Sequence, residues 1–158
     1  MTNLPWLNPQ TIKLVHLLLN SHQKAFGYPL VIHSSEKKSE LINSEQLFSL
    51  GIVVLAHDTA KDPILNYSNA LALHIWERTW SEMIGMPSRL TAPSEERSKR
   101  ARAMENALLR NSISNYQGIR ISSTGKRFLI RKARVWKIWD EHNNAYGQAA
   151  AFSHWQWI

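Results

Sequence analysis

The segment from residue 115 to residue 157 constrains the fold more than any other part of the chain. It holds three runs with the alternating, β-branched character of strands, at 116–122, 127–139 and 148–157. Gly125, in the short connection between the first two runs, can take the positive φ of a tight turn. The second connection, 140–147, is polar and ends in glycine. Connections this short join antiparallel neighbours, so the segment predicts a three-stranded antiparallel meander.

The earlier residues predict helices and strands that add to this sheet or cover it. The run 51–55 is apolar and β-branched, as in a buried strand, and pairing can resume at 64–65. Short helices are expected from 68–69 and at 81–87, and a longer one from Ser94. The predicted buried face of that longer helix consists of Ala101, Met104, Ala107 and Leu108. A sheet with helices inserted between its first and last strands is α+β.

The N-terminal part predicts one long helix and a linker. Asn8 followed by Pro9 is typical of a helix start, and the apolar spacing predicts a helix at 9–26. Its apolar stripe is wide, so we expect the helix to pack on the core of the protein or on a partner. The polar residues that follow are interpreted as a linker. This divides the chain into an N-terminal helix and linker at 1–45 and a folded domain at 46–158.

Charge is unevenly distributed along the chain, whose net charge is +7. Residues 97–137 hold twelve Lys or Arg and one acid, a balance of +11, and the rest holds seven basic and eleven acidic residues, a balance of −4. Such a segment favours anionic partners. Its early cations also oppose the macrodipole of the expected helix, so helix stability does not explain them.

One long phrase and four shorter ordered phrases carry a resemblance to known families. PILNYSNALALHIWERTWSEMIGMPSRL at 63–90 resembles the start of a PAS domain, where a strand leads into a helix. PSRLTA at 87–92, NYQGIRISSTGKRF at 115–128, VW at 135–136 followed by Asp-Glu, and GQAAAFSHW at 147–155 resemble the MEKHLA family. That family is PAS-like, and the chain resembles its stand-alone bacterial members. Other members form the C-terminus of plant class III homeodomain–leucine-zipper transcription factors.

The resemblance implies a PAS-like domain at 46–158. Its fold is a five-stranded antiparallel sheet with short helices over one face, enclosing a small cavity, and here it carries an N-terminal helical extension. The implied role is regulatory: sensing, ligand binding in that cavity, or control of protein association. PAS-like proteins commonly dimerise through flanking helices, so the helix at 9–26 is the candidate for a homodimer or a partner protein.

Pocket-wall candidates are aromatic or polar residues expected to face the cavity. Gln148 alternates with small residues on the last run, and it is the kind of group that orients a ligand in apolar company. Arg120 faces outward if Ile119 and Ile121 face the core; in the opposite phase it enters the cavity and calls for an acidic ligand or a buried carboxylate. The predicted ligand-binding residues are Trp76, Arg89, Tyr116, Arg120, Trp136, Gln148 and Phe152. Arg89 and Arg120 are the candidate anion anchors.

The alternation of apolar residues blurs through 131–134. Phe128 and Ile130 alternate with their neighbours, and then four residues break the pattern. A β-bulge, or a strand shared between the core and the outside, would explain this break.

A competing hypothesis assigns the basic segment to nucleic acid or another anionic partner. Its members would track phosphates while exposed Trp side chains stack on bases, and binding would be mainly electrostatic. The residues of this candidate patch are Arg97, Lys99, Arg100, Arg102, Lys126, Arg127, Arg131, Lys132 and Arg134.

Catalytic and metal chemistry find little support in the sequence. No His pair has metal-ligand spacing, and His57 and Asp58, adjacent in an extended segment, point to opposite faces. We expect no metal site and no enzyme, and we keep a small enzyme on the same cavity as a third hypothesis. The chain has no Cys, which excludes a flavin–cysteinyl adduct. No cofactor is required by the sequence, and non-covalent flavin, or haem held by His74 or His154, stays open.

The sequence also bears on location. It shows no signal peptide, and no apolar stretch approaches the roughly 20 residues that a membrane span needs. We therefore expect a cytoplasmic protein without membrane partners.

Overall fold

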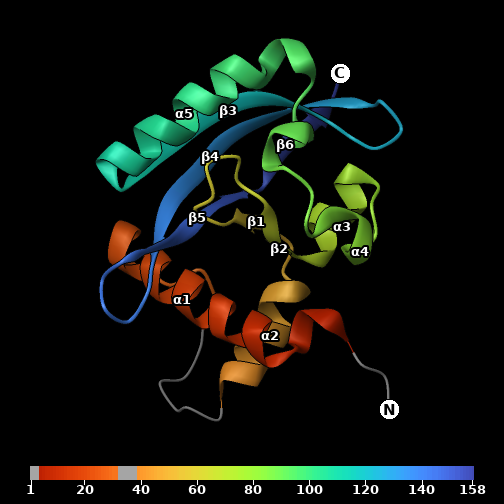
Figure 1. The fold of residues 1–158 in the computed structure, drawn as a ribbon. Coiled ribbons are helices and arrows are strands. Elements are labelled where there is room, and N and C mark those ends of the chain that lie inside the picture. Colours follow the sequence, from red (N-terminus) through yellow and green to blue (C-terminus); the bar gives the residue numbers. More distant parts are fainter. Residues whose placement is uncertain (1–3, 32–38) are drawn as a thin grey trace.

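A computed structural model of the chain describes residues 4–31 and 39–158. Its centre is an antiparallel sheet with the strand order β2-β1-β5-β4-β3 (Figure 1). The strands are β1 (Val53–His57), β2 (Leu65–Ser68), β3 (Ser112–Ile121), β4 (Arg127–Trp139), β5 (Ala145–Phe152) and β6 (His154–Trp157). The expected α+β class and antiparallel sheet are confirmed, and the five strands of the main order are joined by β6, which also pairs with β4.

Strands β3, β4 and β5 form the meander that the sequence predicts. The long strand β4 has the expected bounds, 127–139. β5 and β6 pair one after the other with β4, as a single interrupted strand: Arg134 opposes Ala151 and Arg131 opposes His154. The interruption lies at Ser153, so β6 is not part of the main strand order.

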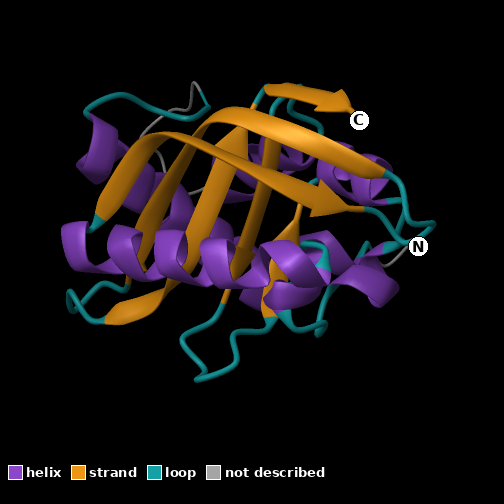
Figure 2. Cartoon of the chain, turned by 90° about the horizontal axis from the view of Figure 1, so that it is seen from above, coloured by secondary structure: helices purple, strands orange, loops and turns teal. Residues whose placement is uncertain are grey.

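Helices cover both faces of the sheet (Figures 1 and 2). One face, here called the outer face, carries α1 (Pro9–Phe26) and α2 (Glu40–Phe48). The other, the inner face, carries α3 (Ala70–Trp76), α4 (Trp80–Met83) and α5 (Arg97–Arg110). Three 3₁₀ turns, Pro5–Leu7, Ser88–Thr91 and Ser94–Glu96, connect or extend these helices. The sheet is thus the middle of three layers, with an apolar core on each side.

The helix α1 begins and ends where its sequence dictates. The side chain of Asn8 accepts a hydrogen bond from Thr11 N at 2.8 Å, and Pro9 needs no partner at the first helical position. Gly27 ends the helix with φ 80°, a left-handed conformation that favours glycine. The apolar stripe of α1, including Leu14 and Leu18, is buried in the outer core, so α1 packs on its own sheet.

A break in β4 decides which side chains reach which face. Lys132 has φ 54°, and here β4 places one residue more than β3 between successive pairs. Ile130 lies on the inner face before this bulge, and Ala133 lies there after it. Trp136 therefore points to the outer face. The bulge expected within 131–134 is confirmed, and the strand also serves both cores.

Candidate ligand-binding site

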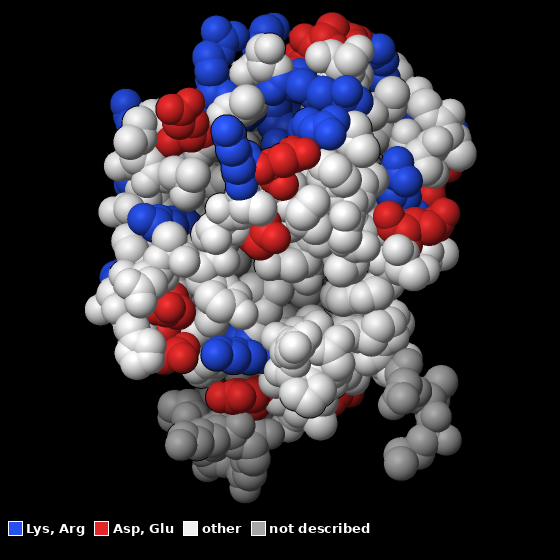
Figure 3. Space-filling model, in the orientation of Figure 1, with Lys and Arg blue, Asp and Glu red and all other residues white. Residues whose placement is uncertain are grey.

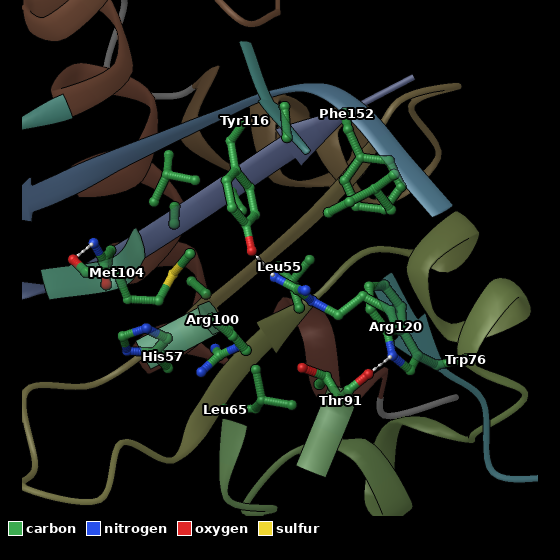
Figure 4. Close-up of a pocket in the computed structure, with 17 residues that line it drawn as sticks. Leu55, His57, Leu65, Trp76, Thr91, Arg100, Met104, Tyr116, Arg120 and Phe152 are labelled. Atoms are coloured by element: carbon green, nitrogen blue, oxygen red, sulfur yellow. Dashed lines mark hydrogen bonds between the residues drawn. The ribbon is translucent and has the colours of Figure 1, made fainter. Parts of the chain in front are cut away.

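A cavity lies between the inner face of the sheet and α5 (Figure 4). Its volume is about 30 Å³, room for two or three water molecules at roughly 10–15 Å³ each. Most of its wall is apolar and comes from β1, β2, β4 and β5, through Leu55, Leu65, Ile130, Ala133 and Phe152. On β5, Gln148, Ala150 and Phe152 share the cavity face, as the alternation of that run predicts.

Arg120 enters the cavity from β3. Its side chain is 95% buried, while Ile119 and Ile121 are only half-buried, so the second of the two phases considered for this strand is the one the chain adopts. The guanidinium donates hydrogen bonds to Ile119 O at 3.0 Å and to the Tyr116 hydroxyl at 3.1 Å. Neither partner is a carboxylate, so within the described ranges the charge is buried without a counter-ion.

Gly118 makes the contact between Tyr116 and Arg120 compatible with the strand. The three residues alternate along β3, and a Cβ on Gly118 would lie 2.7 Å from the Tyr116 hydroxyl and 2.8 Å from a guanidinium nitrogen of Arg120. Any side chain at position 118 would therefore push the pair apart. This is a close-approach role for glycine and not a turn.

Arg100 reaches the same cavity from α5. It is 92% buried, its Nε has no partner, and it forms no ion pair with any residue in 4–31 or 39–158. Burial and, to a smaller extent, the nearby charge of Arg120 lower its pKa to about 10. Sequence reasoning placed Arg100 in a surface patch. The missed signal was its position: Arg100, Met104 and Ala107 follow helical spacing, whereas the expected Leu108 is 42% exposed and Ala101 is exposed.

Two further polar side chains complete the cavity. Gln148 donates from Nε2 to Met104 O of α5 at 2.9 Å, and its side chain also interacts with the His57 ring, although its Oε1 has no hydrogen bond of good geometry among the described residues. His57 opposes Gln148 across the β1–β5 pair, and its Nε2 also lacks a partner of good geometry there. Burial lowers the pKa of His57, so the ring is neutral at pH 7. Sequence reasoning treated His57 as a strand-end residue and missed its place in the wall.

The Asp58 carboxylate forms no hydrogen bond with the His57 ring, and its charge only partly offsets the lowering of the His57 pKa by burial. His57 Nδ1 lies 2.9 Å from the backbone oxygen of Asp58, whereas Asp58 Oδ1 accepts from Ala60 N and Ile64 N in the following turn. The two side chains point apart, as the extended segment predicts.

Five of the seven predicted ligand-binding residues meet at the cavity: Trp76, Tyr116, Arg120, Gln148 and Phe152. The structure places the other two elsewhere. Arg89 is half-exposed and pairs with Asp62 at 3.3 Å. Trp136 is fully buried on the outer face, where its Nε1 donates to Leu18 O of α1 at 3.2 Å. The β4 bulge explains this, because it shifts every later side chain of the strand by one position.

Most members of the proposed basic patch are engaged within the chain. Arg127 pairs with Glu95, Lys126 with Glu77 and Lys99 with Glu96, while Arg97 donates to Ala92 O. Arg131 bonds Gln156, and Arg134 lies over Tyr28 on the outer face. Arg102 and Lys132 are exposed. Figure 3 shows Lys and Arg gathered at the end of the molecule where α5 lies, with Asp and Glu among them.

The cavity does not fit a large cofactor as its side chains lie. A space for two or three water molecules is many times too small for the three rings of a flavin or for haem. His74 and His154, the residues proposed as haem ligands, are exposed and not part of the cavity wall. Within 4–31 and 39–158, no group of three or more His, Asp or Glu could hold a metal ion. We assign no step to a cofactor.

The sheet order, the inner-face helices and the cavity between them define the chain as a PAS-fold protein. One similar structure is the PAS domain of a protein from Colwellia psychrerythraea, with TM-score 0.63, 10% identity, and coverage of 74% of this chain and 94% of that one. An RNA-binding light-oxygen-voltage receptor gives TM-score 0.66 and 12% identity over 78% of this chain, which spans 35% of the receptor. A light-oxygen-voltage domain described with a flavin analogue gives 0.58 and 13%, covering 74% and 84%. Identities this low show a shared fold.

The sequence itself then gives the family. The model of the MEKHLA domain matches residues 12–157, and the chain belongs to the MEKHLA family. The match includes most of α1, the helix that covers the outer face. No curated protein matches the chain. None of the helices described here is both long and apolar enough to cross a membrane.

Proposed function

We propose that this protein is a sensory, regulatory module that binds a small molecule in the cavity between the sheet and α5. One observation carries the proposal: buried polar atoms, among them Arg100 Nε and Gln148 Oε1, border an apolar cavity and lack a hydrogen bond of good geometry within the described part of the chain. Unpaired buried polar groups cost free energy, and proteins keep them mainly where a ligand or an ordered water completes them. Such a wall is typical of ligand sites.

The helix α5 is the element best placed to report the ligand. It is 14 residues long, yet only Arg100 and Ala107 are fully buried. One of its connections to the sheet runs through the cavity wall, where Gln148 bonds Met104 O. At its C-terminal end Leu109 is 80% exposed and Leu108 is 42% exposed. A ligand that moves Gln148 or Arg100 would shift a lightly packed helix and the apolar end it presents to a partner.

The proposal is tested by titrating the full chain with a set of small fragments, neutral and charged, and following backbone amide signals by NMR. We expect changes in two segments, 148–152 and 100–107. Gln148→Leu should uncouple these segments, so that α5 amides exchange faster with solvent. A fragment set that leaves both segments unchanged would contradict ligand binding in the cavity.

Binding of nucleic acid is the second candidate, favoured by the basic segment and by one PAS-fold neighbour that is described as RNA-binding. It ranks lower because Arg100 is buried in the cavity and Arg127, Lys126 and Lys99 already pair with acids. A random oligonucleotide titrated over a salt series tests it. Absence of binding at low salt removes this candidate.

Dimerisation through α1 remains a prediction. The apolar stripe of α1 is already covered by the sheet, so a dimer would use the exposed side of this helix or another surface. Native mass spectrometry of the full chain gives the oligomeric state directly.

A further inference from the structure

We propose that the cavity ligand is a small carboxylate anion, held between the guanidinium groups of Arg100 and Arg120. This inference rests on the proposed function and names the class of ligand that the site takes. It starts from the charge of the cavity. Two arginines from different elements, α5 and β3, point into the same space (Figure 4). Among the residues that the structure describes, no Asp or Glu lines that space.

Folding alone does not favour two buried positive charges without a counter-ion. Removing a guanidinium from water has a large cost, which an opposite charge normally offsets. Acids are at hand nearby, since Glu95 and Glu96 lie just before α5, but they pair with Arg127 and Lys99 outside the cavity. No acid in the described part of the chain balances Arg100 and Arg120, which points to an anion bound as a ligand.

The donors and the walls select a carboxylate over other anions. A guanidinium presents its N–H groups in a plane and matches the two oxygens of a carboxylate. The Tyr116 hydroxyl, bonded to Arg120, supplies a third group beside them. The remaining wall is apolar, through residues such as Leu55, Ile130 and Phe152, and would receive a short hydrocarbon tail. A phosphate, with oxygens in all directions, would leave some of them against these apolar side chains.

The size of the cavity limits the ligand to a short-chain acid. Room for two or three water molecules corresponds to a carboxylate with few carbon atoms. A second hollow of about 190 Å³ lies on the outside of Tyr116 and Arg120, and these two residues line both spaces. Their hydrogen bond therefore separates the cavity from this groove, and its opening gives a route inward.

The test compares acids with their uncharged amides at constant ionic strength. Acetate, propionate and butyrate are titrated by NMR into the full chain, beside acetamide, propionamide, butyramide and inorganic phosphate. Arg100→Met and Arg120→Met should each weaken the best carboxylate at least about thirty-fold, because each leaves the bound anion short of a buried partner. Arg102→Met, an exposed position on the same helix, is the matched control and should leave the affinity unchanged.

The possible outcomes separately test the ligand class, the binding site and the proposed function. Carboxylates that bind while amides and phosphate do not, with loss in both cavity variants, support the inference. Amides or neutral fragments that bind as tightly as the acids, or equal binding of phosphate, overturn the ligand class and leave the proposed function intact. Unchanged carboxylate affinity in Arg100→Met overturns the site, and Arg100→Lys gives a second variant that keeps the charge if the first fails to fold. If no probe perturbs the cavity, the proposed function fails with the inference.

Discussion

The two faces of the sheet differ in the kind of side chain that they bury. On the outer face, Trp136 packs edge-to-face with His22 and Phe26 of α1, with ring centroids 4.8 and 5.9 Å apart. On the inner face, α5 fully buries two residues, and one of them is a charged arginine without a partner among the described residues. The outer face thus packs aromatic and neutral side chains against one another, while the inner face buries the cations of Arg100 and Arg120.

This contrast indicates which face of the sheet carries the ligand-binding site. Helices cover both faces, so a cover of helices alone says nothing about a site. What differs is the charge of the unpartnered buried groups. The outer core also holds polar atoms without a partner among the described residues, His22 Nε2 and the Tyr67 hydroxyl, but burial keeps both side chains neutral at pH 7. Around Trp136 the indole N–H has a backbone partner, at Leu18 O. Around the cavity, Arg100 Nε and Gln148 Oε1 have none among the described residues. Stability is therefore expected to depend on the outer face and ligand binding on the inner face.

The largest expected effect comes from the outer core. Trp136→Ala should lower the free energy of unfolding by about 3–5 kcal/mol, because it removes a fully buried aromatic side chain and leaves a cavity. Leu109→Ala on α5 is the control, and since this side chain is 80% exposed, the change should stay within about 0.5 kcal/mol. Urea unfolding measures both. Similar losses in the two variants would contradict the division between the faces.

Acid should weaken the outer face through His22. Burial lowers the pKa of His22 from 6.5 to about 4, and the Arg134 guanidinium adds to the shift. Between these values the unfolded chain binds a proton that the folded chain does not, so stability is full above pH 6.5 and falls as pH drops toward 4. The loss amounts to about 3 kcal/mol.

His22→Leu should flatten much of this decline in urea unfolding curves recorded from pH 7 to pH 4. His57 contributes in the same direction, because burial also lowers its pKa. The exposed His142 offers the control, and His142→Gln should keep the full pH dependence. A variant without His22 that loses as much stability on acidification as the native chain would rule out this assignment.

The fold could be predicted from the sequence to a large extent because its signals are local. Turn residues and alternation indicate the meander, and Asn8 with the apolar spacing of 9–26 delimits α1. The site was only partly predictable. Trp136 was assigned to the cavity because the broken alternation at 131–134 left the phase of the following residues open, and a shift of one residue sends a side chain to the other face.

Arg100 shows a second limit of sequence reasoning. An arginine in a basic segment looks like part of a solvated surface, and its burial depends on what the sheet offers opposite it. Besides its helical spacing with Met104 and Ala107, the local clue was that a cation early in a helix opposes the macrodipole, so helix stability does not explain its position. His57 gave no such clue, because its role follows from its pairing with Gln148 across two strands distant in sequence.

Removing the unpaired charge should stabilise the inner face. Without ligand, Arg100→Met is expected to raise the free energy of unfolding by about 1–2 kcal/mol, because a flexible apolar side chain replaces a buried cation that has no counter-ion among the described residues. Arg102→Met should change it by less than about 0.5 kcal/mol. Guanidinium unfolding at fixed salt provides the measurement. A destabilised Arg100→Met would mean that the guanidinium is satisfied in the ligand-free protein.

The smallest effect on stability, and the sharpest on access to the cavity, is expected from Gly118→Ala. The added Cβ would approach the ends of the Tyr116 and Arg120 side chains to within 3 Å, and both are flexible enough to move aside. The free energy of unfolding should therefore fall by less than about 1 kcal/mol.

The same substitution should break the hydrogen bond between the two side chains. Propionate should then bind to the protein faster, which NMR line shapes recorded during a propionate titration would show. Ala at the exposed neighbour, Gln117→Ala, should leave the rate unchanged. Equal association rates in the two variants would show that the Tyr116–Arg120 pair does not control access, even if both arginines bind the anion.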